Sequence, residues 1–330
     1  MANADLTNRA QTRSLHQTTG AARTRTITQT IVRGVCFICA AFCVVATVGI
    51  FAILFLESLP FFKEVNLGSF LTGTKWEMMG STPKYGVLPL VVGTLLITVG
   101  SGFVAIPLGL GVGIYLSEYA HKRVRGILKP VLELLAGVPS VVFGYFALSL
   151  VTPGLRGGVA WLHEVLPTLN PILPEFRPAN AAAGAIVVGF MTLPLVSSLC
   201  EDAITAVPKQ LREAAFGLGC TKSEVIWRVV LPAAISGIIA SFILALSRAV
   251  GETMAVTIAA GATPQLTFNP GNEVMTMTAQ IVNVSKGDVS RGDIRYQSIF
   301  AIGLLLFLIT FAMNILAQRY VKKMSGRSAS

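Results

Sequence analysis

The stretch "GVCFICAAFCVVATVGIFAILFL", residues 34–56, has 23 residues and no charged side chain. A helix needs about 20 consecutive, mostly apolar residues to cross the hydrocarbon core of a bilayer. A run from Val229 to about Ala262 is interrupted only by Arg248 and Glu252. The other charge-free runs are residues 85–117, 134–155, 178–200 and 296–318. The sequence therefore predicts an all-α, polytopic membrane protein with six transmembrane helices.

The composition agrees with a membrane protein. Of the 330 residues, 53% are hydrophobic and 13% are charged, whereas soluble domains carry about 25% charged residues. The first run exceeds the roughly 7–15 residues of a secretory signal's apolar region, and no small-residue cleavage site follows it. We expect this run to remain in the protein as a membrane anchor.

The net charge of +10 is distributed unevenly. With the N-terminus in the cytoplasm, the inner segments hold 17 Lys and Arg, namely residues 1–33, 117–130, 202–232 and 319–330. The outer segments hold 8, namely residues 58–85, 152–180 and 262–295. Positive charge favours the cytoplasmic side of membrane proteins, so both termini are predicted to be cytoplasmic. The basic surplus then faces anionic membrane lipid and the cytosol, and nucleic acid is not an expected partner.

The chain divides into three parts by composition. Residues 1–30 have almost no large apolar side chains and cannot form a core, so we expect a disordered, basic cytoplasmic tail. Residues 31–320 form one transmembrane domain, because no loop exceeds about 35 residues. Residues 321–330 are expected to form a short cytoplasmic C-terminal tail.

Proline and glycine predict irregular helices. Pro107 lies inside the second run and predicts a kinked or broken helix, and Pro139 and Pro194 should bend their spans. Gly109 and Gly113 have the small-xxx-small spacing that lets helix backbones approach closely. Ordinary helix packing is the alternative explanation, since both residue types are common in membrane helices.

The loop "AVPKQLREAAFGLGCTKSEVIWRVVLP", residues 206–232, predicts two short amphipathic helices at the inner membrane surface. Pro208 suits the first turn of a helix, and Gly219 can take the left-handed conformation that ends one. Thr221 and Glu224 have the spacing of a capping box, which opens a second helix. Pro232 is then expected to begin the fifth span.

This loop resembles the permease subunits of binding-protein-dependent ABC importers. In those subunits, Glu-Ala-Ala is separated by three residues from a Gly. Nine further residues lead to an Ile, and one more residue leads to Leu-Pro. Here Val229 stands at the position of the Ile. The matching residues are Glu213, Ala214, Ala215, Gly219, Leu231 and Pro232. The resemblance implies a type I permease fold and a hairpin that docks on a separate ATPase subunit. The chain has no Gly-Lys dipeptide for a phosphate-gripping loop, so ATP and Mg²⁺ are expected on that partner and no cofactor on this chain.

Three further stretches narrow the resemblance. Together, "AGVPSVVFG" (136–144), "MTLPLVSSLCEDAITAVP" (191–208) and "RAVGETMAV" (248–256) look like the permeases of the phosphate-specific importer, the Pst system. Met-Ala after Gly-Glu-Thr and the long basic tail are similar to the C type (PstC type). The resemblance covers residues 31–320. It implies a bacterial plasma (inner) membrane, a homologous second permease (PstA type), an ATPase dimer (PstB type) and an extracytoplasmic phosphate-binding protein (PstS type).

The two charges of the fifth span are candidates for the substrate pathway. Arg248 follows Pro232 by 16 residues, about 24 Å along a helix axis, and Glu252 is expected one turn further on the same face. A lone central charge costs at least about 2.5–3.5 kcal/mol. Guanidinium matches phosphate oxygens, and a carboxylate can accept the proton of hydrogen phosphate, which sulfate lacks. We expect Arg248, Glu252 and Thr253 to line the pathway; the alternative is a structural ion pair with the second permease.

Other functions are weaker candidates. A permease for another oxyanion, molybdate or sulfate, is the main alternative, and a sensing role could coexist with transport. A membrane enzyme is disfavoured, because His16, His121 and His163 lie in separate segments and cannot form a metal site. Cys36 and Cys39 form a C-x-x-C that we interpret as apolar filler.

Overall fold

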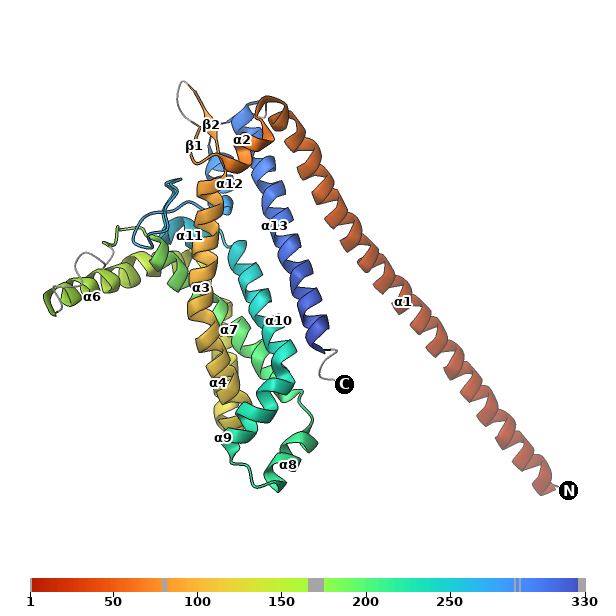
Figure 1. Ribbon diagram of the computed structural model, residues 1–330. Coiled ribbons are helices and arrows are strands. Elements are labelled where there is room, and N and C mark those ends of the chain that lie inside the picture. The colour runs from red at the N-terminus through yellow and green to blue at the C-terminus, as the bar shows by residue number, and fades with distance from the viewer. Residues whose placement is uncertain (1, 79–81, 166–174, 288, 291, 326–330) are drawn as a thin grey trace. The chain divides into compact units, whose positions relative to one another are not determined.

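The computed structural model describes residues 2–78, 82–165, 175–287, 289–290 and 292–325, with side chains described from Gln29 to Lys322. Figure 1 labels the helices and strands along the chain. The chain separates into two compact units, one reaching to Leu56 and the other starting at Glu57. Each is described by itself.

The first unit consists of the long helix α1 (Ala2–Glu64) as far as Leu56. Its apolar segment is long enough to span a membrane, and its side chains are almost all exposed, as expected of residues that face lipid. The helix starts at Ala2, whereas we expected a disordered tail over residues 1–30. Adding residues to an existing helix avoids the cost of nucleation, and the Ala, Arg and Gln of this segment are good helix formers.

Four further helices of the second unit are long and apolar enough to cross a membrane, which confirms four more of the predicted spans. They are α3 (Leu88–Ile114) with the π-helical turn η1 (Tyr115–Tyr119), α7 (Ala181–Thr205), α10 (Leu231–Val250) and α13 (Ile294–Ser325). Pro107 in α3 and Pro194 in α7 lie inside continuous helices, so of the kink or break predicted at Pro107 the break is absent. Because α13 continues to Ser325, the start of the expected C-terminal tail is helical, and residues 326–330 lie outside the described residues.

The bend that Pro139 predicts within the third charge-free run, residues 134–155, is confirmed, and the run is not one continuous helix. The helix α4 (Lys122–Ala136) meets a second helix, Ser140–Val165, at an angle of 91°. Gly137 caps α4, and Pro139 has no N–H with which to continue its hydrogen bonds. The sixth span exists only if this bent pair counts as one. The second helix comprises α5 (Ser140–Phe146), the π-helical turn η2 (Ala147–Val151) and α6 (Thr152–Val165).

Helices α3 and α7 pack closely along the glycines of α3. A Cβ atom built on Gly109 would lie 2.6 Å from Cγ1 of Val196. One built on Gly113 would lie 2.7 Å from Cβ of Cys200. Real Cβ atoms do not approach so closely, which confirms that these two glycines allow the backbones to meet.

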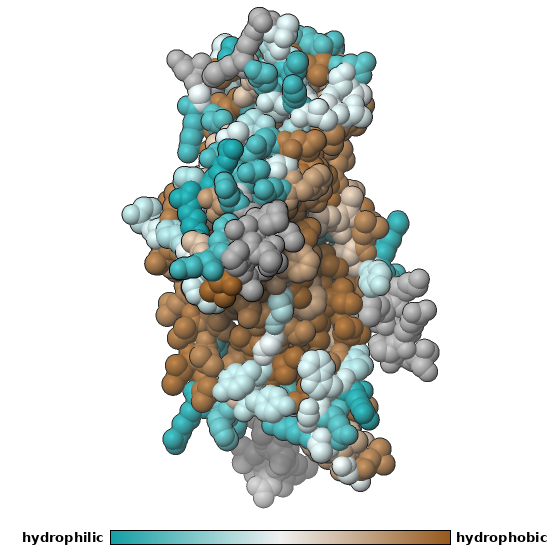
Figure 2. All heavy atoms as spheres, turned by 60° about the vertical axis from the view of Figure 1, so that its left-hand side comes forward, coloured by the Kyte–Doolittle hydropathy of each residue, from teal (hydrophilic) through white to brown (hydrophobic). Residues whose placement is uncertain are grey.

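The two ends of the second unit differ in structure. In Figure 1, α8 (Lys209–Gly217) and α9 (Lys222–Val225) lie at one end, and α12 (Met277–Lys286) lies with a β-hairpin region at the opposite end. The β-hairpin region consists of α2 (Leu67–Thr72), β1 (Trp76–Glu77) and β2 (Lys84–Tyr85), with the strands paired antiparallel. On the face in Figure 2, hydrophobic side chains form a band with hydrophilic ones beyond it. This pattern is typical of a protein embedded in a bilayer.

An aromatic cluster fills the core at the end that carries the β-hairpin region. Phe61 lies edge-on to Phe70 and Tyr85, with ring centroids 5.5 and 5.4 Å apart. Tyr85 also contacts Trp76 edge-on. These rings pack with residues of α3, α12 and α13, so they fasten the ends of those helices together.

Candidate functional site

The fifth span ends earlier than we predicted. Helix α10 stops at Val250 and Gly251 caps it, donating its N–H to the Arg248 carbonyl at 3.1 Å. Glu252 therefore lies in the break before α11 (Met254–Ala259), and the prediction that Arg248 and Glu252 share one helix face is wrong. Among the described side chains, no ion pair joins these two residues. Glycine weakens a helix, and this one coincides with the end of the span.

Glu252 and Thr253 bond to the backbone around the break. The Glu252 carboxylate accepts a hydrogen bond from the Ala255 N–H at 3.4 Å, and its carbonyl accepts one from the Thr278 hydroxyl at 2.8 Å. The Thr253 hydroxyl donates to the Gly251 carbonyl at 3.1 Å. These bonds satisfy polar groups that the interrupted helix leaves free.

Arg248 lines a cavity of about 190 Å³ between α4, α7 and α10. Ser241 Oγ and Cys200 Sγ are 3.1 Å apart, so these two residues lie at the same level of α10 and α7. Arg248 is seven residues further along α10, about 10 Å. The other lining residues are Lys129, Leu132, Glu133, Ala136, Met191, Pro194, Leu195, Ser198 and Glu201.

A second charged cluster, which the sequence analysis missed, lies at this cavity. The side chain of Glu201 on α7 is fully buried, and Lys129 on α4 is 3.4 Å from its Oε2. Arg125, also on α4, forms an ion pair with Oε1. The exposed Asp202 is 3.7 Å from Lys129. The available signals were the i, i+4 spacing of Arg125 and Lys129 and the position of Glu201 directly after a charge-free run, but neither shows that α4 packs on α7.

The predicted loop between the fourth and fifth spans is a helical hairpin with two corrections of detail. Gly219 has φ +84°, and Thr221 and Glu224 form the expected capping box. The second helix does not end before the span. It continues from Lys222 to Val250, with the π-helical turn η4 (Ile226–Val230) immediately before Pro232. Pro232 lacks the N–H that a regular turn would use there, so it sits inside a locally widened helix.

The hairpin, residues 206–232, presents part of its motif outward. Glu213, Ala214, Gly219 and Pro232 are exposed, whereas Ala215 and Leu231 are buried in the core. Four large apolar side chains are also exposed on it: Leu211, Phe216, Trp227 and Leu218, the last at 85%. An apolar surface rimmed by polar residues is typical of a protein interaction site.

Arg212 ties the hairpin to the membrane helices. Its guanidinium donates to Glu118 Oε1 at 3.0 Å, to the Ile204 carbonyl at 2.7 Å and to the Val207 carbonyl at 3.2 Å. Glu118 lies in the turn that extends α3, the Ile204 carbonyl lies in the last turn of α7, and the Val207 carbonyl lies just beyond that helix. One side chain of α8 therefore contacts two spans. The sequence analysis missed this residue, although it directly precedes the Glu-Ala-Ala motif.

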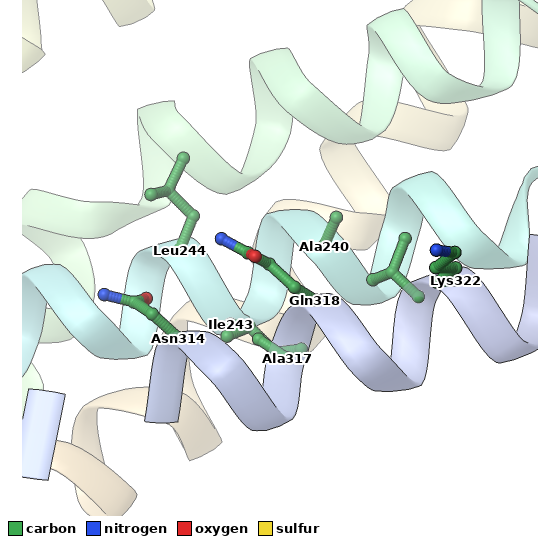
Figure 3. Close-up of a pocket in the computed structure, with 8 residues that line it drawn as sticks. Ala240, Ile243, Leu244, Asn314, Ala317, Gln318 and Lys322 are labelled. Carbon is green, nitrogen blue, oxygen red and sulfur yellow. The ribbon is translucent and has the colours of Figure 1, made fainter. Parts of the chain in front are cut away.

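A larger groove of about 650 Å³ lies between α10 and α13. Figure 3 shows Asn314, Gln318 and Lys322 along α13 beside Leu244 of α10. None of the predicted site residues lines it. In the part of the chain that the structure describes, no group of three His, Cys, Asp or Glu is arranged to hold a metal ion.

Comparisons with known proteins give a consistent result. The family described as "Binding-protein-dependent transport system inner membrane component" matches residues 105–326. The chain is 34% identical over 268 residues to the "Phosphate transport system permease protein PstC" of Mesorhizobium japonicum, covering 79% of this chain and 80% of that protein. It is 32% identical over 289 residues to the "Probable ABC transporter permease protein YqgH" of Bacillus subtilis, covering 86% and 87%.

Among solved structures, a chain of the inward-facing MetNI methionine ABC transporter is similar. The TM-score is 0.52 at 17% identity, over 72% of this chain and 97% of that one. At this identity the likeness shows the fold alone, which is the expected all-α permease fold of type I importers.

Proposed function

We propose, from the premise that this chain belongs to the family of binding-protein-dependent transport system inner membrane components, that it is the C-type permease of an ATP-driven phosphate importer. It is a multi-pass inner-membrane protein. Several relatives named as PstC phosphate permeases are 30–34% identical to it over most of its length. The observation that carries the proposal is this relationship, together with an arginine at a cavity inside the membrane domain.

Arg248 is the residue we assign to the cargo. It lies in the last turn of α10, and a charge without a partner is costly at membrane depth, which favours a functional reason for its presence. Its side chain is exposed to the cavity and the surface beside it. The planar guanidinium offers paired donors that match the oxygens of phosphate. A homologous second permease would enclose the other side of the path.

Glu252 and Thr253 are proposed to line the same path. They stand in a helix break, and irregular backbone at membrane depth is tolerated where it lines a cavity or is buried in protein. The carboxylate of Glu252 would accept the proton of hydrogen phosphate. Sulfate offers no such proton, so it would meet only repulsion there.

The hairpin is proposed to dock on an ATPase dimer that binds ATP and Mg²⁺. Its exposed Glu213, Ala214 and Gly219 and the apolar Leu218 form the contact surface. Closure of the dimer on ATP would draw the hairpins together, and Arg212 would pass this movement to α3 and α7. The path would then open outward to a phosphate-binding protein.

Uptake by the complete complex tests the proposal. The chain is co-expressed with its second permease, ATPase and binding protein, and the purified complex is placed in liposomes. We expect ATP-dependent uptake of labelled phosphate that unlabelled phosphate suppresses, and that a tenfold excess of sulfate or molybdate does not. Equal suppression by molybdate or sulfate would assign the chain to another oxyanion.

A further inference from the structure

A second layer of charge lies beside the cavity that Arg248 lines. Glu201 is nearly level with the Cys200–Ser241 contact, so it lies about 10 Å from Arg248 along α10, toward the end of the unit that carries α8 and α9. Lys129 of α4 lines the same cavity. An anion leaving Arg248 in the direction of the hairpin therefore meets Lys129 next.

This cluster differs from a simple ion pair because it has two cations for one buried carboxylate. One fully buried carboxylate, Glu201, holds two cations, Arg125 and Lys129, whose side chains are 38% and 32% exposed. A buried charge left without a partner costs several kcal/mol. With two cations present, one can leave and the carboxylate still keeps the other.

We propose that Lys129 is a second phosphate-binding residue, on the cytoplasmic side of Arg248, and that Glu201 occupies it while the path is empty. Arriving phosphate takes Lys129 from Glu201, and Arg125 keeps Glu201 paired. When phosphate leaves, Glu201 recaptures Lys129 and so promotes release. This inference rests on the proposed function, since it needs an anionic cargo.

Size and charge agree with this role. A cavity of about 190 Å³ is several times the ≈30 Å³ that one water occupies, so it admits an oxyanion of five heavy atoms. Lysine is a compact charge on a flexible stem, which suits a group that exchanges partners. Glu133 lines the cavity one turn from Lys129 and repels an anion, so binding is favoured beside the cations Lys129 and Arg248 and away from Glu133.

The exchange predicts a different kinetic change for each of the two partners in the reconstituted complex. Lys129→Gln removes the site, so phosphate uptake should fall about tenfold, equivalent to ~1.4 kcal/mol, and Lys129→Arg should restore part of it. Glu201→Gln removes the carboxylate that competes with phosphate for Lys129. Phosphate should then bind more tightly and leave more slowly, so the KM for uptake should fall and kcat should fall about tenfold. Arg123→Gln is the matched control, because it removes an exposed cation of the same helix α4; its uptake should change less than twofold.

The double variant Lys129→Gln with Glu201→Gln separates this role from a structural one. Two amides keep a hydrogen bond between α4 and α7 without charge. Uptake that stays as low as in Lys129→Gln supports the exchange, and uptake restored to the wild-type level overturns it. Where Glu201→Gln does not assemble, Lys129→Gln and Lys129→Arg decide the matter. Wild-type transport of phosphate with a normal Lys129→Gln refutes this inference alone, whereas no phosphate transport by the wild-type complex refutes the proposed function.

Discussion

Arg212 offers the sharpest test of how the hairpin acts on the membrane helices. We consider the change Arg212→Gln, which shortens the side chain and removes its charge. It leaves Glu118 without its cation and two backbone carbonyls, those of Ile204 and Val207, without their donor. Helix α8 then loses its polar link to both α3 and α7.

The magnitude follows from the burial of the pair. Hydrogen bonds to charged groups contribute about 1.5–3 kcal/mol each when buried, and breaking a buried ion pair costs about 3–5 kcal/mol. The side chains of Arg212 and Glu118 are 19% and 13% exposed, so solvent screening reduces these values. We expect Arg212→Gln to cost about 3 kcal/mol in total, of which about 1–2 kcal/mol is coupling between the two charges.

The assay compares transport with hydrolysis in liposomes that contain the whole complex. Labelled phosphate uptake and ADP release are measured together, because hydrolysis of ATP itself produces unlabelled phosphate. We expect Arg212→Gln to keep ADP release within twofold and to lower phosphate carried per ADP about tenfold, which is ~1.4 kcal/mol. Lys209→Gln, which removes an exposed cation at the start of the same helix, should behave as wild type.

A double-mutant cycle with Glu118→Gln gives the coupling directly. If the pair transmits movement, the double variant is no worse than Arg212→Gln alone. Transport per ADP that is unchanged in Arg212→Gln would refute this reasoning. So would a parallel loss of ADP release, because that result means that the ATPase no longer docks.

Three further predictions concern backbone and packing. Gly219→Ala should destabilise the hairpin by about 1–2 kcal/mol, because a φ of +84° is unfavourable for a residue with a Cβ. The space around Gly219 is open, so a steric clash does not contribute. Thermal unfolding should show no such loss for Gly217→Ala, because Gly217 is helical. Gly113→Val should lower the yield of folded protein in detergent, at a cost of about 1–3 kcal/mol, because even a Cβ would stand 2.7 Å from one in α7. The pKa of Asp293 is lowered from its usual 3.8 by the backbone N–H and side chain of Arg295, so its stabilisation of the start of α13 is present above that pH and is lost as the pH falls below it. The hydrogen-exchange protection factor of that first turn, which corrects for the slower intrinsic exchange in acid, should be lower at pH 3 than at pH 7, and the difference should be smaller in Asp293→Asn.

The spans were predictable because charge alone marks them. Four charge-free runs, and the run that only Arg248 and Glu252 interrupt, each correspond to a single apolar helix, since an ion in lipid is costly. The third run gives two helices rather than one; composition cannot distinguish a bent pair of helices from a straight one, whereas Pro139 predicts the bend. Gly137 and Pro139 gave a local signal of the bend, but a proline inside α3 or α7 gave the same signal without a break.

The candidate site was only partly predictable. Arg248 stands out in any apolar run, but its position relative to Glu252 depended on whether Gly251 ends the helix, and glycine is common inside membrane helices. Lys129 and Glu201 are 72 positions apart and meet only because α4 packs on α7. Capping residues such as Thr221 and Glu224 act within one turn, so the sequence predicted them correctly.

The central claim, that a phosphate path passes Arg248, is tested most directly by ATP-driven uptake of labelled phosphate in the complete complex carrying Arg248→Lys or Glu252→Gln. We predict that Arg248→Lys, which keeps the charge but loses the planar fork, lowers uptake at least about tenfold. Glu252→Gln should weaken the discrimination against sulfate. Normal uptake in both variants, with normal amounts of the complex in the membrane, would contradict the account.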